Sequence, residues 1–103
     1  MSEFRLKILL SDKKIFEDDA ISVTVSCENR LITVLSGHAP MTAMLVEGSI
    51  VVKTQKEEME GIAGAGVLQV DRDGAAILVH SFQWAGDETA EDNVEETTGD
   101  GLL

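Results

Sequence analysis

The residues best suited to nucleophilic or acid–base chemistry are two histidines, His38 and His80, and one cysteine, Cys27. Hydrolytic catalysis needs a nucleophile, a base and an orienting group that converge. His80 ends an alternating strand in which Ile77 and Val79 share one face, so a structural role explains it. Cys27 lies on the apolar face of another alternating strand, where a thiol acts as a small hydrophobic filler. These residues predict no catalytic centre, and a small hydrolase that uses His38 and an Asp is kept as an alternative.

Two further segments have compositions that are typical of ligand sites. The glycines of residues 61–66 could cradle a phosphate, but a P-loop also needs a Gly-Lys pair, which this chain lacks. Asp71-Arg72-Asp73-Gly74 lacks the ligand spacing and the closing Glu of a calcium loop. We predict instead a hairpin turn at Asp73-Gly74 and a bend or close strand approach at 61–66. The acidic clusters at 17–19 and 57–58 are interpreted as solvated loop tips, so we expect no cofactor and no metal.

The chain is strongly acidic, and its charge is unevenly spread. Its net charge at pH 7 is −11, with 19 acidic and 8 basic side chains. Residues 1–86 hold all the basic side chains and have a net charge of −4, whereas residues 87–103 hold seven acidic groups and have a net charge of −7. An acidic surface repels phosphates, so we expect no nucleic-acid partner and no docking on an anionic lipid face. A basic protein surface stays possible as a partner.

An alternation of apolar and polar residues is the clearest pattern, and it indicates half-buried strands. Ile21, Val23, Val25 and Cys27 alternate with serines and a threonine. Because aromatic residues make up 4% of the chain and hydrophobic residues 44%, the core is expected to be aliphatic. Further short strands are predicted over residues 4–10, 31–35, 41–46, 49–55, 58–63, 67–71 and 75–82. This spacing predicts an all-β fold over residues 1–87, a two-layer sandwich of mainly antiparallel strands.

Residues 88–103 have a different composition, with Val94 as the single large apolar residue before the final two leucines. Such a segment buries too little apolar surface to offset the entropy of ordering it, so we predict a flexible acidic tail. No run of the chain approaches the roughly 18–20 apolar residues that a membrane helix needs, and the N-terminus lacks the apolar stretch of a secretory signal. We therefore expect no direct membrane insertion.

One segment is more specific than these patterns. Residues 35–45, Leu-Ser-Gly-His-Ala-Pro-Met-Thr-Ala-Met-Leu, resemble the Pro-Gly-His-Ala-Pro-Leu-Leu-Thr-like signature of the epsilon subunit of F-type ATP synthases, called delta in mitochondria. Residues 46–52 resemble the family's Pro-Gly-x-Ile/Val-x-Val strand, and residues 64–79 resemble its following hairpin. The resemblance covers residues 4–87. Ser36 stands where the family usually has Pro, and residues 28–33 replace a Gly-Glu-Leu-Gly-like stretch.

The resemblance implies a non-catalytic subunit of the central stalk, or rotor. Such a subunit couples rotation of the c-subunit ring to gamma during ATP synthesis driven by the proton-motive force, while catalysis stays on the alpha/beta hexamer. The residues that align with the loop that meets the ring are Glu28, Asn29, Arg30 and Leu31. The residues that align with the gamma-facing edge are Ser11, Gly37, His38, Ala39, Pro40, Met41 and Thr42.

The resemblance also implies a location and a difference in regulation. The protein is expected on the cytoplasmic face of the bacterial inner membrane, as a peripheral part of the complex. The family usually adds a C-terminal helical hairpin that can inhibit ATP hydrolysis, but residues 88–103 lack the length and the apolar stripe for two packed helices. We therefore expect that inhibition to be absent. The alternative function is an acidic β-sandwich adaptor that binds a basic protein and is unrelated to a rotary ATPase.

Overall fold

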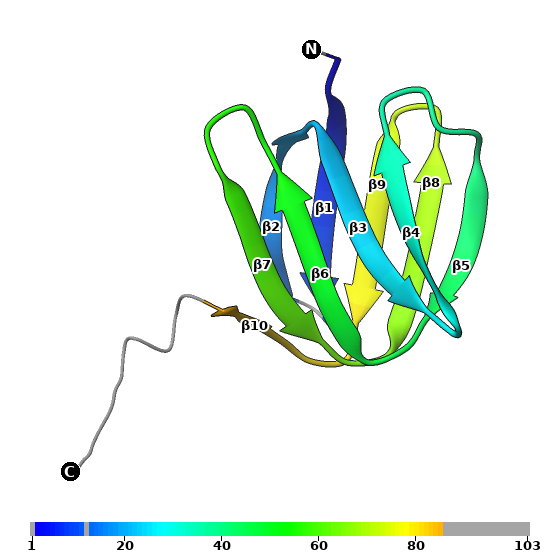
Figure 1. Cartoon of the computed structure of the whole chain (residues 1–103), viewed down its shortest axis with the longest axis vertical. Coiled ribbons are helices and arrows are strands. Elements are labelled where there is room, and N and C mark those ends of the chain that lie inside the picture. The colour runs from blue at the N-terminus through cyan, green and yellow to red at the C-terminus, as the bar shows by residue number, and fades with distance from the viewer. Residues whose placement is uncertain (1, 12, 86–103) are drawn as a thin grey trace, which may run out of the picture.

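The computed structural model of the chain describes residues 2–11 and 13–85, which form ten β-strands in two five-stranded sheets (Figure 1). The strands are β1 (Phe4–Leu10), β2 (Lys13–Ala20), β3 (Ser22–Cys27), β4 (Arg30–Leu35), β5 (Met41–Leu45), β6 (Gly48–Lys53), β7 (Glu58–Ala63), β8 (Gly66–Asp71), β9 (Gly74–Val79) and β10 (Phe82–Trp84). Sheet A has the strand order β2-β1-β9-β8-β5, and sheet B has the order β10-β7-β6-β3-β4. All paired strands are antiparallel except β1 and β9. The predicted all-β sandwich is thus confirmed.

Two local predictions need correction. The acidic residues 17–19 are not a loop tip, because they lie in the edge strand β2, where solvent can hydrate their side chains. The strand predicted over residues 75–82 ends at Val79, and the chain then crosses from sheet A to β10 of sheet B. The chain also changes sheets between β5 and β6, where the Val46 N–H donates to the Ser26 carbonyl (3.1 Å). Local pattern shows an alternation, but it does not show to which sheet the next strand belongs.

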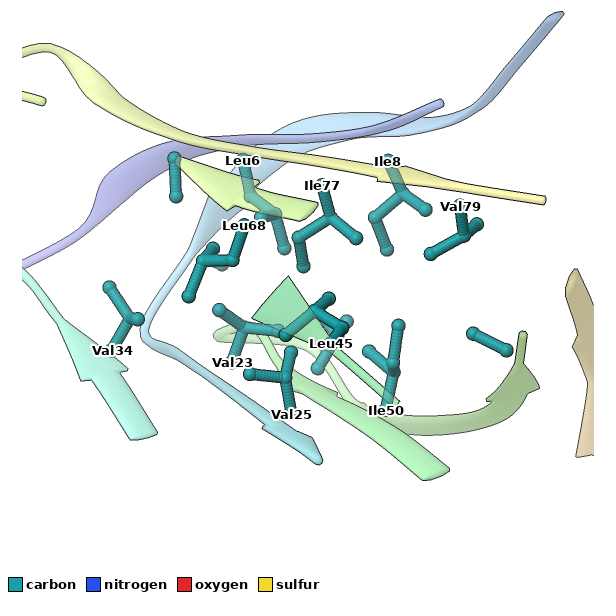
Figure 2. Close-up of a cluster of buried hydrophobic side chains, with 14 of the residues drawn as sticks. Leu6, Ile8, Val23, Val25, Val34, Leu45, Ile50, Leu68, Ile77 and Val79 are labelled. Carbon is teal, nitrogen blue, oxygen red and sulfur yellow. The ribbon is translucent and has the colours of Figure 1, made fainter. Parts of the chain in front are cut away.

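The core is aliphatic, as predicted. Alternate residues of the strands point between the sheets, and the largest fully buried side chains include Leu6, Ile8, Ile50, Leu68 and Ile77, each 2% exposed or less. Figure 2 shows them meeting across the two layers. Each such side chain removes apolar surface from water, which stabilises the fold by about 1.5–3 kcal/mol per residue. This shared layer holds the loops at both ends of the sandwich in fixed positions.

The turns follow the predicted chemistry. The Asp71 carboxylate Oδ1 accepts hydrogen bonds from the backbone N–H groups of Asp73 (2.8 Å) and Gly74 (3.1 Å), which is the side-chain turn that favours Asp at this position. A Cβ on Gly66 would collide with the carbonyl oxygen of Leu78. The glycine-rich segment therefore serves close strand approach, as the sequence indicated.

The sandwich has two ends and two sides. The upper end in Figure 1 carries the connections at residues 36–40, 54–57 and 72–73, and the lower end carries those at 28–29, 46–47, 64–65 and 80–81. The side formed by β2 and β10 is called the closed side, and the side formed by β4 and β5 is called the open side.

Candidate functional site

The β4–β5 loop at the upper end is held by its own hydrogen bonds. Gly37 has φ +84°, in the left-handed region that favours glycine, and the His38 N–H donates to the Leu35 carbonyl (3.1 Å). The His38 ring Nδ1 lies 2.8 Å from the Ala39 carbonyl oxygen. Since a carbonyl only accepts, Nδ1 carries the proton and donates it. His38 therefore fixes the shape of its own loop.

The same loop borders a shallow hollow of about 420 Å³ at the upper end. The opposite wall is the β8–β9 turn, with Asp71 and Asp73, and Phe4 of β1 lies at the rim. The Asp71 carboxylate already accepts from the backbone of its turn. Within residues 2–11 and 13–85 no three His, Cys, Asp or Glu side chains gather in a way that could hold a metal ion. The hollow is thus a recess between two turns, in which the side chains of His38 and Asp71 bond to the backbone of their own turns.

The β3–β4 turn projects from the lower end. Cys27 of β3 pairs with Arg30 of β4, so the turn consists of Glu28 and Asn29. Asn29 adopts φ 68°, a conformation that Asn tolerates better than most residues do. The tip is formed by the two turn residues and the first two residues of β4. Its polar residues are all exposed, and Leu31 beside them is 66% exposed; the polar residues are Glu28, Asn29 and Arg30. The tip therefore offers both a cation and a large apolar side chain to a partner.

The structure divides the residues predicted to face gamma. Gly37, His38, Ala39 and Pro40 lie at the upper end, and Met41 and Thr42 begin β5 below them. Ser11 follows β1, whose last residue pairs with Val79, so Ser11 lies at the lower end with Asn29. The four residues predicted to contact the ring are thus brought together in one tip. The residues predicted to contact gamma are spread along the length of the sandwich.

Exposed apolar side chains gather toward the lower end, a feature that the sequence analysis did not identify. Five of the large exposed apolar side chains among the described residues lie in the lower half and are 42–72% exposed: Leu31, Met44, Val46, Ile62 and Leu78. A sixth such side chain, Leu35, lies near the upper end. On the outer face of sheet A the strand register aligns Met44, Val67, Leu78 and Leu9 in one row. The sequence does carry a signal for this row: β5, β8 and β9 have apolar residues on both of their faces, where a half-buried strand would have them on one face only.

The charged groups of sheet A concentrate on β1 and β2. The Arg5 guanidinium lies 3.6 Å from the Glu17 carboxylate and 3.4 Å from that of Asp19, and Lys14 Nζ lies 2.5 Å from Glu17. The hydrogen bond from Lys14 lowers the pKa of Glu17 below its ordinary value against a smaller opposing effect of burial, with help from the nearby charges of Lys7 and Arg5. This edge of the sandwich is therefore covered by paired charges.

The chain is similar in sequence to a family of known proteins. Residues 3–85 match the family model of the ATP synthase Delta/Epsilon chain, beta-sandwich domain. The ATP synthase epsilon chain of Micrococcus luteus is 32% identical over 91 residues, which cover 87% of this chain and 99% of that protein. The epsilon chain of Caldanaerobacter subterraneus is 28% identical over 82 residues, which cover 79% of this chain and 59% of that protein. The chain thus spans about three fifths of the length of the first relatives that it matches.

Solved structures share the fold. A chain of the Euglena gracilis mitochondrial ATP synthase, in a structure of its OSCP/F1/c-ring, superposes with a TM-score of 0.76 at 16% identity, covering 82% of this chain and 54% of that one. A chain from the central stalk and c-ring of the Tetrahymena thermophila enzyme superposes with a TM-score of 0.71 at 12% identity, covering 91% and 75%. Within the described part of this chain, no helix is long and apolar enough to cross a membrane.

Proposed function

The chain belongs to the family of ATP synthase delta/epsilon chain β-sandwich domains, and from this premise we propose that it is a non-catalytic rotor subunit of an F-type ATP synthase. In this role it joins the c-ring to gamma and reaches the alpha/beta hexamer only through gamma. It works as a peripheral protein on the cytoplasmic face of the bacterial inner membrane. In this proposal residues 1–87 form the working domain. The acidic tail predicted over residues 88–103 lies outside the residues that the structure describes.

The main support is that the predicted ring-contact tip and the main loop predicted to face gamma lie at opposite ends of one sandwich, while Ser11, also predicted to face gamma, lies at the lower end. The β3–β4 tip with Asn29 is at the lower end, and the Gly37–Pro40 loop is at the upper end. A continuous aliphatic core joins them. Because close-packed interiors have low compressibility, displacement of one end is transmitted to the other. Such an element can pass rotation from a ring to a shaft.

At the ring-facing tip, we expect Leu31 to contribute more free energy of binding to the ring than Arg30 does. An exposed ion pair made by Arg30 contributes only about 0–1 kcal/mol. Full burial of a leucine side chain contributes about 1.5–3 kcal/mol, and Leu31 is 66% exposed in the free chain, so most of this surface is available to a partner. Arg30 then fixes orientation, through a carboxylate on the ring, more than it adds affinity.

The test is co-purification of the full chain with gamma and the c-ring from native membranes, followed by substitutions at the tip. Leu31→Asp should weaken attachment of the c-ring about tenfold, since burial of the new charge opposes binding. Arg30→Glu should have a smaller effect, seen as a proton leak that is not coupled to synthesis. Leu35→Asp is the matched control, because Leu35 lies on the same face of β4 at the upper end.

Two results would count against the proposal. Absence of gamma and the c-ring from the purified material would remove the rotor function and favour an adaptor of another kind. Equal loss of ring attachment in the Leu31 and Leu35 variants would keep the function but reject the lower end as the ring-facing surface.

A further inference from the structure

The two sides of the sandwich end their sheets in different ways. On the closed side, Phe16 of β2 and Trp84 of β10 meet edge to face with ring centroids 6.2 Å apart, and Phe82 packs on Trp84 at 4.7 Å. Five charged side chains also line β2: Lys13, Lys14, Glu17, Asp18 and Asp19. Rings that bridge the sheets and charges along an edge are both features that discourage addition of another strand.

The open side has neither protection. Strand β5, Met41–Leu45, contains no charged residue, and β4 contains one, Arg30 at its start. One edge of β5 pairs with β8, and within residues 2–11 and 13–85 no strand pairs with its other edge. The Val46 N–H is already used by Ser26, so the free backbone edge of sheet A on this side is β5 itself, while β4, which starts with Arg30, is the edge of sheet B. An uncharged edge with free N–H and C=O groups is a template for a further strand.

Side chains on both faces of β5 suit such an addition. On the outer face, Met44 is 72% exposed and ends the apolar row that runs through Val67 and Leu78. On the inner face, Met41 and Ala43 pack against the core but stay partly exposed. A strand placed beside β5 would extend the row with one set of its side chains and cover the edge of the core with the other.

Charge excludes two other occupants of this edge. A second copy of the chain carries a net charge of −11, so two copies repel each other. The chain's own residues 87–103 carry seven acidic groups, which find no cation along β5. The described part of the chain also ends past β10, on the closed side (Figure 1). The occupant that fits is an uncharged extended strand of a different protein.

We propose that β5 accepts an uncharged, extended strand of gamma by backbone hydrogen bonding, so that sheet A continues into the shaft of the rotor. This inference rests on the proposed function and adds to it the mode of contact. Backbone pairing resists sliding along the strand direction, because each hydrogen bond fixes the register of the two chains. The joint transmits rotation without depending on an exposed ion pair between the two proteins.

The first test measures binding of purified gamma to the full chain by calorimetry. Met44→Lys should weaken binding about tenfold or more, because the lysine charge must be desolvated beside the incoming strand. Ile62→Lys is the matched control, since Ile62 is 50% exposed on the outer face of sheet B, and it should change binding by less than about twofold. Equal binding of gamma to the wild-type and Met44→Lys chains would overturn the inference.

The second test uses the wild-type chain and reports the hydrogen bonds directly. Amide hydrogen exchange should slow by about a hundredfold on addition of gamma at every second residue of 41–45, because the intervening amides already bond to β8. Unchanged exchange with gamma bound would overturn the strand addition and leave the rotor function standing. Failure of the wild-type chain to bind gamma would overturn both, and protection of β5 in a dimer without gamma would assign the edge to a second copy instead.

Discussion

The closed and open sides of the sandwich show two ways of ending a β-sheet. On the closed side, three aromatic rings bridge the two sheets, and β2 presents paired charges to solvent. On the open side, the edge strands β4 and β5 carry exposed apolar side chains, which are Leu31, Leu35 and Met44. The closed side protects its edge strands with bridging rings and with charges, whereas the open side leaves apolar surface and backbone groups to be covered. Stability of the isolated chain should therefore depend on the first side and binding on the second.

The largest expected effect on stability concerns the aromatic cluster. Trp84→Ala should lower the free energy of unfolding by about 2–3 kcal/mol, less than for a fully buried tryptophan because Trp84 is half-buried. Met44→Ala, on the open side, should lower it by less than about 0.5 kcal/mol. Urea denaturation of the isolated full chain measures both. Similar losses in the two variants would remove the distinction between the sides.

A smaller effect is expected in the β4–β5 loop. Gly37→Ala should destabilise the chain by about 1 kcal/mol, because an L side chain is strained at φ +84° although open space surrounds the position. Gly37→Asn should recover part of that loss, since Asn tolerates the left-handed region. Thermal unfolding provides the measurement. If alanine and asparagine cost the same, the conformation of the backbone is not what limits this position.

The charged edge gives a pH-dependent prediction. The pKa of Glu17 is lowered from 4.5 in the folded state, chiefly by the hydrogen bond from Lys14, so the ionised form favours folding. That contribution is complete above pH 4.5 and is lost as the pH falls through the lowered value. Glu17→Gln should thus be less stable than the wild type at pH 7 and equal to it in strong acid. A difference that persists unchanged in acid would mean that charge is not its cause.

The smallest effect is expected for the acidic segment 88–103. Deletion of residues 88–103 should leave the melting temperature of the chain and the rate of ATP hydrolysis by the complex nearly unchanged, because this segment offers little apolar surface for packing. Steady-state hydrolysis of the complex with full and shortened chains tests this. Activation by several fold would show that the acidic segment restrains the rotor.

Much of the strand content could be predicted locally. The bounds of β1 and β7 were predicted as the structure has them. The hairpin predicted at Asp73-Gly74 is present, with its turn at Arg72 and Asp73 and with Gly74 as the first residue of β9. The strand β2 was not predicted, because charged residues interrupt its alternation of apolar and polar side chains and a bulge shifts its register against β1 near Leu9. Of the candidate site, the tip at 28–31 was predicted as one group, but the position of Ser11 at the same end was not.

The sequence by itself determined the all-β class, the aliphatic core and the hairpin that joins β8 to β9, because side-chain alternation and turn chemistry depend on residues close together in the chain. The tertiary structure alone decided which strands became edges, since β1 lies beside β9 in a parallel pair and β5 lies beside β8. Pairing of this kind joins residues far apart in the sequence, and a period of two shows which face a residue takes but not which strand lies next to it. The unpaired edge of β5 could for that reason be seen only in the folded chain.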